Sequence, residues 1–202
     1  MRSLICYRKV RSSIFRKLVL SCVVCIFTLC EADAQLAIKN NLLYDAVLTP
    51  NLGMEFGMGR KVTGQLTYGL NPWEFSDTKQ ARHWLVMPEL RLWTCSKFNG
   101  HFFGIHAMGG EFNVQGYESP FSSLLDVRAE SRYEGWYVGG GITYGYQWIL
   151  SEHWNLEMSV GFGYDYIQFK EYECGTCGTF ARQDYTHYIG PTKLTLCFEY
   201  LF

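Results

Sequence analysis

The sequence has few charged residues, few prolines and no long apolar run after its first 34 residues. Charged residues make up 18% of its 202 residues and aromatic residues 17%. This balance excludes disorder as the main state, because disordered chains have many charges and few aromatics. The formal net charge of −1 gives no electrostatic basis for binding nucleic acid. The missing apolar run argues against helical membrane spans, which need about 20 apolar residues. The 20 glycines and the many aromatic residues favour β-structure instead.

Residues 1–34 have the three parts of a secretory signal peptide. A basic start precedes an apolar stretch over 18–29, and Ala32, Asp33 and Ala34 follow. This order predicts cleavage before Gln35. A membrane anchor is the weaker alternative, because this stretch is shorter than the roughly 20 residues that a spanning helix needs. The expected mature domain is therefore 35–202, with 12 basic and 17 acidic residues and a net charge of −5.

Apolar side chains recur at every second position along this domain. The clearest segments are 136–150, 154–166 and 194–202, where large apolar residues alternate with Gly, Ser, Thr, Asn and isolated charges. Period two is the signature of a strand with one apolar face. Weaker versions of the pattern in the first half bring the predicted number of strands to eight, and Pro88 inside one of them predicts a local irregularity.

The predicted connections alternate between short and long. Short turns are expected near 59–62, 95–100 and 151–153, and long polar loops over 71–82, 111–132 and 170–189. This alternation is typical of an all-β, eight-stranded antiparallel up-and-down transmembrane β-barrel of the bacterial outer membrane. The alternative is a soluble, lipocalin-like barrel, whose second face should be charged. Here that face is mostly small and polar, which suits the narrow interior of an eight-stranded barrel.

Eight charged residues fall on the predicted inner face. They are Lys39, Glu55, Glu89, Arg91, Glu157, Asp165, Lys193 and Glu199. Charges in a narrow, poorly solvated interior must pair, because an unpaired one costs several kcal/mol. We expect a structural salt-bridge network, and the alternatives are a conduction path or a carboxylate acid/base pair.

Four cysteines remain after the expected cleavage. Cys174 and Cys177 are candidates for a disulfide in a long loop of an exported protein. The alternatives are half of a metal site, completed by His187 and Asp184, or a redox role. Cys95 and Cys197 are expected in the periplasmic half, and their pairing stays open.

No catalytic residue is expected. The histidines are scattered over predicted loops, turns and the inner face, and no GxSxG motif accompanies them. The Gly139–Gly141 run lies inside a predicted strand with no helix after it, so it does not fit a dinucleotide site. We therefore expect neither a cofactor nor an enzyme. The alternative is an outer-membrane enzyme that modifies lipid, which would need a nucleophile and a base near the membrane face.

The last strand ends the chain on an aromatic residue. Its apolar positions are Leu194, Leu196, Phe198, Tyr200 and Phe202. This pattern resembles the C-terminal signal that outer-membrane barrels present to their insertion machinery, and the mature chain resembles small OmpA/OmpX-like barrels.

A narrower resemblance rests on three stretches, at 39–45, 51–55 and 174–178 ahead of Gly190 to Lys193. They are similar to a domain-of-unknown-function family of small barrels from gut and oral Bacteroidota, over nearly all of 36–202. Its members are often encoded near fimbrial genes, which implies a surface role, and the family offers no catalytic residues to carry over.

The predicted function is non-enzymatic. We expect a barrel in the outer membrane, in contact with its lipid and lipopolysaccharide and placed there by the insertion machinery. Its extracellular loops are expected to serve a structural or binding role, or to assist the assembly of a fimbrial or other envelope protein, because loops on a rigid scaffold are where binding usually occurs.

Overall fold

The computed structural model describes residues 35–202, except 77–78, 116–130 and 174–179. The predicted signal peptide, Cys174 and Cys177 therefore lie outside the described residues. The elements are β1 (Leu36–Asn41), α2 (Leu42–Ala46), β2 (Asn51–Gly57), β3 (Val62–Asn71), β4 (Glu74–Ser76), β5 (Lys79–Trp93), β6 (Gly100–Gln115), β7 (Arg132–Ile149), β8 (Trp154–Tyr172) and β9 (Phe180–Leu201).

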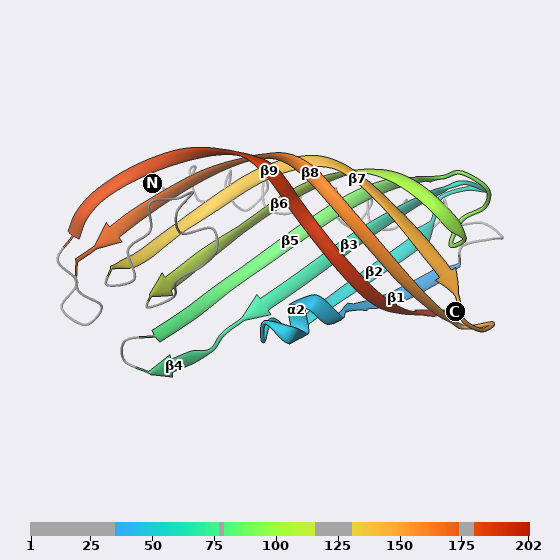
Figure 1. Ribbon diagram of the computed structural model, residues 1–202, viewed down its shortest axis with the longest axis horizontal. Coiled ribbons are helices and arrows are strands. Elements are labelled where there is room, and N and C mark those ends of the chain that lie inside the picture. The colour runs from blue at the N-terminus through green and yellow to red at the C-terminus, as the bar shows by residue number, and fades with distance from the viewer. Residues whose placement is uncertain (1–34, 77–78, 116–130, 174–179) are drawn as a thin grey trace, which may run out of the picture. The chain divides into compact units, whose positions relative to one another are not determined.

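Eight of the strands form a closed antiparallel ring. The order is β3-β2-β1-β9-β8-β7-β6-β5, and pairing between β3 and β5 closes it (Figure 1). The short β4 pairs only with β5. The predicted all-β, eight-stranded up-and-down fold is thereby confirmed. None of the described helices combines the length and apolarity that a membrane span requires.

The two ends of the ring differ. We call the end with the connections 58–61, 94–99 and 150–153 the turn end, and the opposite end the loop end. At the turn end, Trp93, Phe98 and Phe102 pack together inside the ring with Ala37. The Trp93 indole also donates to Thr63 Oγ1 at 2.9 Å. An apolar layer therefore fills the turn end of the interior.

The ring has its polarity reversed relative to a water-soluble protein. Charged side chains such as Glu55, Arg91 and Glu157 lie buried inside, whereas large apolar side chains point outward. Outward side chains between 45% and 67% exposed include Leu66, Leu92, Phe103, Ile105, Ile142, Val160 and Phe162. The predicted alternation thus has its apolar face on the outside of the ring.

The first strand is shorter than the pattern predicted. The alternation of Leu36, Ile38, Leu42 and Tyr44 predicts one strand over 36–45, but β1 ends at Asn41 and α2 follows. The Asn41 side chain accepts a hydrogen bond from the Leu43 N–H at 3.2 Å, which caps the helix. Asn51 accepts from the Asn41 N–H at 2.7 Å and donates to the Asp45 carboxylate at 3.0 Å. Local side-chain bonds therefore override the weak period-two pattern here.

The predicted long loops were wrong in their bounds. Strand β5 already begins at Lys79, β6 continues to Gln115, and β8 and β9 pair from Tyr172 and Phe180 onward. The loop ends of β5, β8 and β9 carry polar residues on both faces, so their alternation cannot be read from hydrophobicity. In β6, Phe112 and Val114 continue the alternation up to Gln115. His83 and His187, expected on loops, consequently lie on β5 and β9.

The irregularity expected near Pro88 is present on one side only. Pairing of β5 with β6 stops after Val86 and resumes at Glu89. Pairing with β3 continues, since Leu66 lies opposite Pro88. The missing N–H of proline explains why one of the two ladders is interrupted.

Candidate functional site

Seven of the eight predicted inner charges meet in one network. It combines Lys39, Arg91 and Lys193 with Glu55, Glu89, Glu157 and Glu199. None of the seven is more than 4% exposed. The residues come from β1, β2, β5, β8 and β9, so the network joins strands on several sides of the ring.

Arg91 lies at the centre of this network. Its Nη1 is 2.8 Å from Glu55 Oε2 and 2.7 Å from Glu157 Oε2, and its Nη2 is 3.2 Å from Glu89 Oε2. A second bond joins Nη2 to Glu157 Oε1 at 3.0 Å. The Glu157 contact is thus bidentate, which is the strong geometry for a guanidinium and a carboxylate. The guanidinium also lies 4.4 Å from the centre of the Phe102 ring.

Two lysines complete the network. Lys39 Nζ contacts Glu55 at 2.5 Å, Glu199 at 3.3 Å and also Glu157. Lys193 pairs with Glu89. Three cations thus face four carboxylates, and Gln147 donates to Glu199 at 2.7 Å. This amide supplies a donor for the carboxylate in excess, and the network fills the interior above the apolar layer.

Asp165 does not join the network. It is 7% exposed, and its Oδ1 has no hydrogen-bond partner. It lies nearer the loop end, opposite Gly139 on β7 and Tyr188 on β9. The alternation of inner and outer positions along a strand places Asp165 inside the ring. It does not give the height of Asp165 along the ring axis, which is why the sequence groups it with the other inner charges.

His106 connects β6, β7 and β9 inside the ring, between the charge network and Asp165. One ring nitrogen lies 2.9 Å from Thr143 Oγ1 and the other 2.9 Å from Thr192 Oγ1. Both ring nitrogens are therefore engaged by hydroxyl groups. These two bonds tie β6 to β7 and β9.

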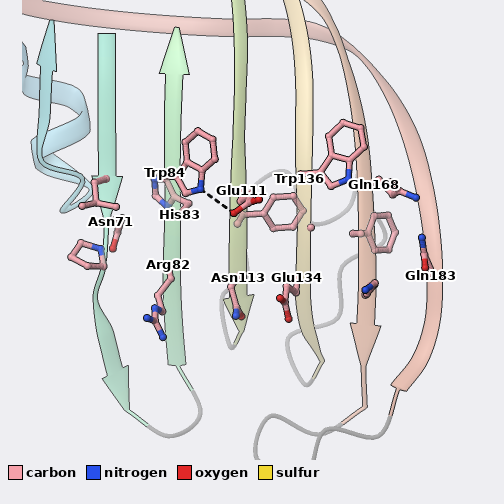
Figure 2. Close-up of a pocket in the computed structure, with 16 residues that line it drawn as sticks. Asn71, Arg82, His83, Trp84, Glu111, Asn113, Glu134, Trp136, Gln168 and Gln183 are labelled. Atoms are coloured by element: carbon pink, nitrogen blue, oxygen red, sulfur yellow. Dashed lines mark hydrogen bonds between the residues drawn. The ribbon is translucent and has the colours of Figure 1, made fainter. Parts of the chain in front are cut away.

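A cavity of about 700 Å³ occupies the loop end of the ring. Residues of β3 and of β5 to β9 line it (Figure 2). His83, Phe112, Gly135 and Phe169 lie side by side in the register of β5 to β8. Phe169 is buried, and this row shares the inner face with buried Tyr133 and Glu171.

The neighbouring row of the register points to the outside of the ring. It consists of Trp84, Glu111, Trp136 and Gln168. The Trp84 indole donates to Glu111 at 3.1 Å.

One hydroxyl approaches a histidine at the edge of this cavity. Thr49 Oγ1 lies 3.3 Å from His83 Nε2, and His83 Nδ1 lies 3.1 Å from the carbonyl oxygen of Ala81. Asn71 Nδ2 donates to the same Thr49 oxygen at 3.3 Å. Thr49 is only 2% exposed. These bonds hold segment 47–50 against β3 and β5.

A second polar cluster at the loop end was missed by the sequence. Glu171 accepts from the Tyr133 hydroxyl at 2.9 Å and from Arg182 Nε at 2.7 Å. It lies beyond the Trp84 and Trp136 row. Burial alone would raise the pKa of the Glu171 carboxyl, but hydrogen bonds from Arg182, Tyr133 and Ser131 lower it overall. The sequence missed this cluster because 170–189 was expected to be a loop. In a loop, side chains do not alternate between an inner and an outer face, so no inner position could be assigned to Glu171 or Arg182.

The metal alternative depends on Cys174 and Cys177, which lie outside the described residues, so it stays an open alternative. In the part of the chain that the structure describes, no group of three or more His, Cys, Asp or Glu side chains could hold a metal ion. His187 instead stacks against Tyr164, whose hydroxyl lies beside its Nδ1. Asp184 accepts from the Tyr185 N–H at 2.8 Å. The predicted Cys174–Cys177 disulfide lies outside the described residues and stays a prediction.

Cys95 and Cys197 are both free thiols, the first exposed and the second buried. We expect an alkylating reagent to modify Cys95 rapidly in the folded protein and Cys197 only after unfolding, because a buried sulfur is out of the reagent's reach. Peptide mass mapping after timed alkylation measures both rates. Equal rates at the two positions would contradict this placement of β9.

The apolar residues of the C-terminal signal lie on the outer face of β9. Leu194, Phe198 and Phe202 are exposed. Phe198 and Tyr200 pack against Trp154 of β8, with ring centres 4.8 and 4.9 Å apart. An aromatic cluster therefore marks the turn end of the outer surface.

Comparison with protein families identifies one match. The model of a family described as proteins of unknown function, DUF3575, matches residues 18–202. A comparison with curated proteins gives no match. Since the family model covers most of the sequence, this chain belongs to the DUF3575 family.

Proposed function

We propose that this protein is an integral outer-membrane barrel with a non-enzymatic role, which binds a partner at its loop end or assists envelope or fimbrial assembly there. The observation that carries the proposal is the reversed polarity of the ring. Seven paired charges are buried inside, while apolar side chains such as Ile105 and Ile142 stand more than 60% exposed outside. In water such a large exposed apolar surface would promote aggregation. In the hydrocarbon core of a membrane the same surface is favourably solvated.

The spacing of the outer aromatic residues supports the same proposal. Trp136 and Trp148 are both on β7 and about 40% exposed. Twelve residues at about 3.3 Å each, tilted by about 40°, separate them by roughly 30 Å along the ring axis. This is close to the roughly 25 Å height of the apolar band of outer-membrane barrels. The two tryptophans therefore fit the two interfacial belts.

Heat-shift electrophoresis of an outer-membrane extract tests the membrane proposal. We expect the unboiled protein to migrate as a compact band and the boiled protein to migrate differently, because paired strands in a closed ring resist SDS until they are heated. Fractionation of the cells should place the protein with the outer membrane. Recovery in the periplasmic fraction without a heat shift would overturn the proposal and favour a soluble carrier.

The second candidate is a lipid-modifying enzyme, and Thr49 is the residue that favours it. Its hydroxyl faces the His83 Nε2 while His83 Nδ1 faces a carbonyl oxygen, as in a nucleophile and its base. We favour the non-enzymatic role because Thr49 is almost fully buried and also accepts from Asn71. Mass spectra of lipid A from cells with and without the protein should be identical. A change in acyl number that Thr49→Val abolishes would establish the enzyme instead.

A further inference from the structure

The loop-end cavity opens on the outer face of the sheet. On β7, Gly135 lines it together with its two outward neighbours Glu134 and Trp136, whereas the inner residues Tyr133 and Tyr137 do not. Strands β5, β6 and β8 contribute the same kind of triplet, one inner residue and the two outward residues beside it. A cavity inside the ring would be lined by successive inner side chains instead. The cavity is therefore a groove between two rows of outward side chains, and we call it the outer groove.

Each wall of the outer groove is one row of the strand register. The wall nearer the turn end is mainly apolar and aromatic, and it consists of Leu70, Trp84, Glu111, Trp136 and Gln168. The wall nearer the loop end is polar throughout, and it consists of Arg82, Asn113, Glu134, Lys170 and Gln183. Figure 2 shows the polar row closer to the loops than the tryptophans. The groove thus runs across the strands with an apolar side and a hydrogen-bonding side.

Two tryptophans of the apolar wall flank a carboxylate. Trp84 and Trp136 lie on either side of Glu111, two strands apart (Figure 2). Neighbouring strands are about 4.8 Å apart, so the two positions are separated by about 10 Å. The Trp84 indole is held by its bond to Glu111 at 3.1 Å, and the Trp136 ring packs against Tyr166 with ring centres 5.7 Å apart. Indoles fixed at this spacing can contact a six-membered ring placed above Glu111.

The charges around the polar wall are balanced within the protein. Arg82 pairs with Glu74 at 2.5 Å. Arg132, beside this wall, lies 3.7 Å from Glu134 and donates to Asn113 Oδ1 at 2.9 Å. The lining as a whole has two basic and two acidic side chains, so it carries no net charge. A phosphate group would find no excess of cations here, whereas a neutral ligand that donates and accepts hydrogen bonds suits this wall.

We propose that the outer groove binds a neutral linear saccharide that lies across β5 to β9. A sugar ring has a face of C–H groups that stacks on aromatic rings, and a rim of hydroxyl groups that bond to carboxylates, amides and ammonium groups. The groove offers both sides at once. The strand spacing of about 4.8 Å is close to the advance of one sugar along a linear glycan. A volume of about 700 Å³ lies within the usual range for small-molecule sites.

This inference rests on the proposed function and specifies the partner that the loop end binds. In a membrane-spanning ring, Trp136 lies in the aromatic belt at the loop end. The apolar wall then meets the boundary of the hydrocarbon, and the polar wall lies in the layer of lipid head groups. A glycolipid of the outer leaflet and a free polysaccharide both offer the required chemistry, and the experiment separates them.

An array of immobilised neutral and phosphorylated oligosaccharides tests the site with the full, folded protein in nanodiscs. We expect neutral chains of several sugars to bind, with an affinity that changes little with salt, because no net charge is involved. The best-bound oligosaccharide is then titrated in its free form and linked to one acyl chain in the nanodisc. Tighter binding of the linked form identifies a glycolipid as the ligand, and equal affinities identify a free polysaccharide.

Trp136→Leu is the test variant, and Trp148→Leu is its matched control. Both tryptophans lie on the outer face of β7, and they are 41% and 43% exposed. Trp148 lies at the turn end and does not line the groove. Trp136→Leu should weaken saccharide binding about tenfold, the loss expected for one aromatic stack. Trp148→Leu should bind like the natural protein.

The outcomes separate this inference from the proposed function. A heat shift in all three proteins shows that each barrel is folded. The saccharide site is then wrong, while the barrel stands, if no oligosaccharide binds, if only phosphorylated chains bind, or if Trp136→Leu and Trp148→Leu bind equally. Absence of the heat shift in the natural protein would instead reject the membrane barrel, and saccharide binding that Trp136→Leu weakens would still support the groove.

Discussion

Replacing Arg91 with alanine is expected to destabilise the protein by about 3–5 kcal/mol, the usual cost of breaking a buried ion pair from one side. The guanidinium contacts Glu55, Glu89 and Glu157, and its loss leaves these carboxylates with only Lys39 and Lys193. The interior at this level is closed to water, so hydration cannot replace the missing cation. Urea unfolding followed by the heat-shift band measures the change.

Arg82→Ala is the matched control for this experiment. Arg82 pairs with Glu74, and both side chains are more than half exposed. An exposed pair contributes about 0–1 kcal/mol, so this variant should unfold close to the natural protein. If Arg91→Ala unfolds at the same urea concentration as Arg82→Ala, the charge network does not stabilise the ring. Water inside the ring would then have to solvate the three carboxylates in place of Arg91.

Ile142→Lys is expected to cost about 2–4 kcal/mol if the ring spans a bilayer, the depth-dependent cost of a lysine at the midplane of an outer-membrane barrel. Ile142 is 67% exposed and lies halfway between Trp136 and Trp148 on β7. In water the same change would be almost neutral, because it places a charge on an exposed surface. The change in the free energy of unfolding, measured in lipid vesicles, therefore shows whether lipid or water surrounds the outer face of the ring.

Leu150→Lys provides the comparison for this prediction. Leu150 is 56% exposed just after the turn end of β7, two positions beyond Trp148 and on the same outer face. A lysine near the interface costs only about 0–1 kcal/mol, so the two variants should differ by at least about 1 kcal/mol. Equal, small effects at both positions would contradict a bilayer around the ring and support the soluble alternative.

The network also argues against an open pore through the interior of the ring. The seven charged side chains are almost completely buried, and the layer of Trp93, Phe98 and Phe102 lies below them. An eight-stranded ring leaves room for side chains and little else. The functional surfaces are therefore expected at the loop end, where the cavity and the Glu171 cluster lie.

The sequence by itself determined the strand period and the faces of most strands. Alternation is local, since successive side chains of a strand point to opposite faces, so parity was sufficient to place Lys39, Glu157 and Lys193 inside. It failed at 42–46, where the cap at Asn41 overrides a weak period, and at 170–173 and 180–189, where both faces carry polar residues although β8 and β9 continue there.

Only the tertiary structure decided which inner charges meet. Lys39 and Glu157 are 118 positions apart, and Lys193 and Glu89 are 104 apart. Their contacts depend on the stagger of the closed ring, which sets the height of each residue, and no local pattern contains that height. The same stagger leaves Asp165 outside the network. It also leaves β9 without a strand partner on its β1 side above Cys197 among the described residues, because β1 ends at Asn41.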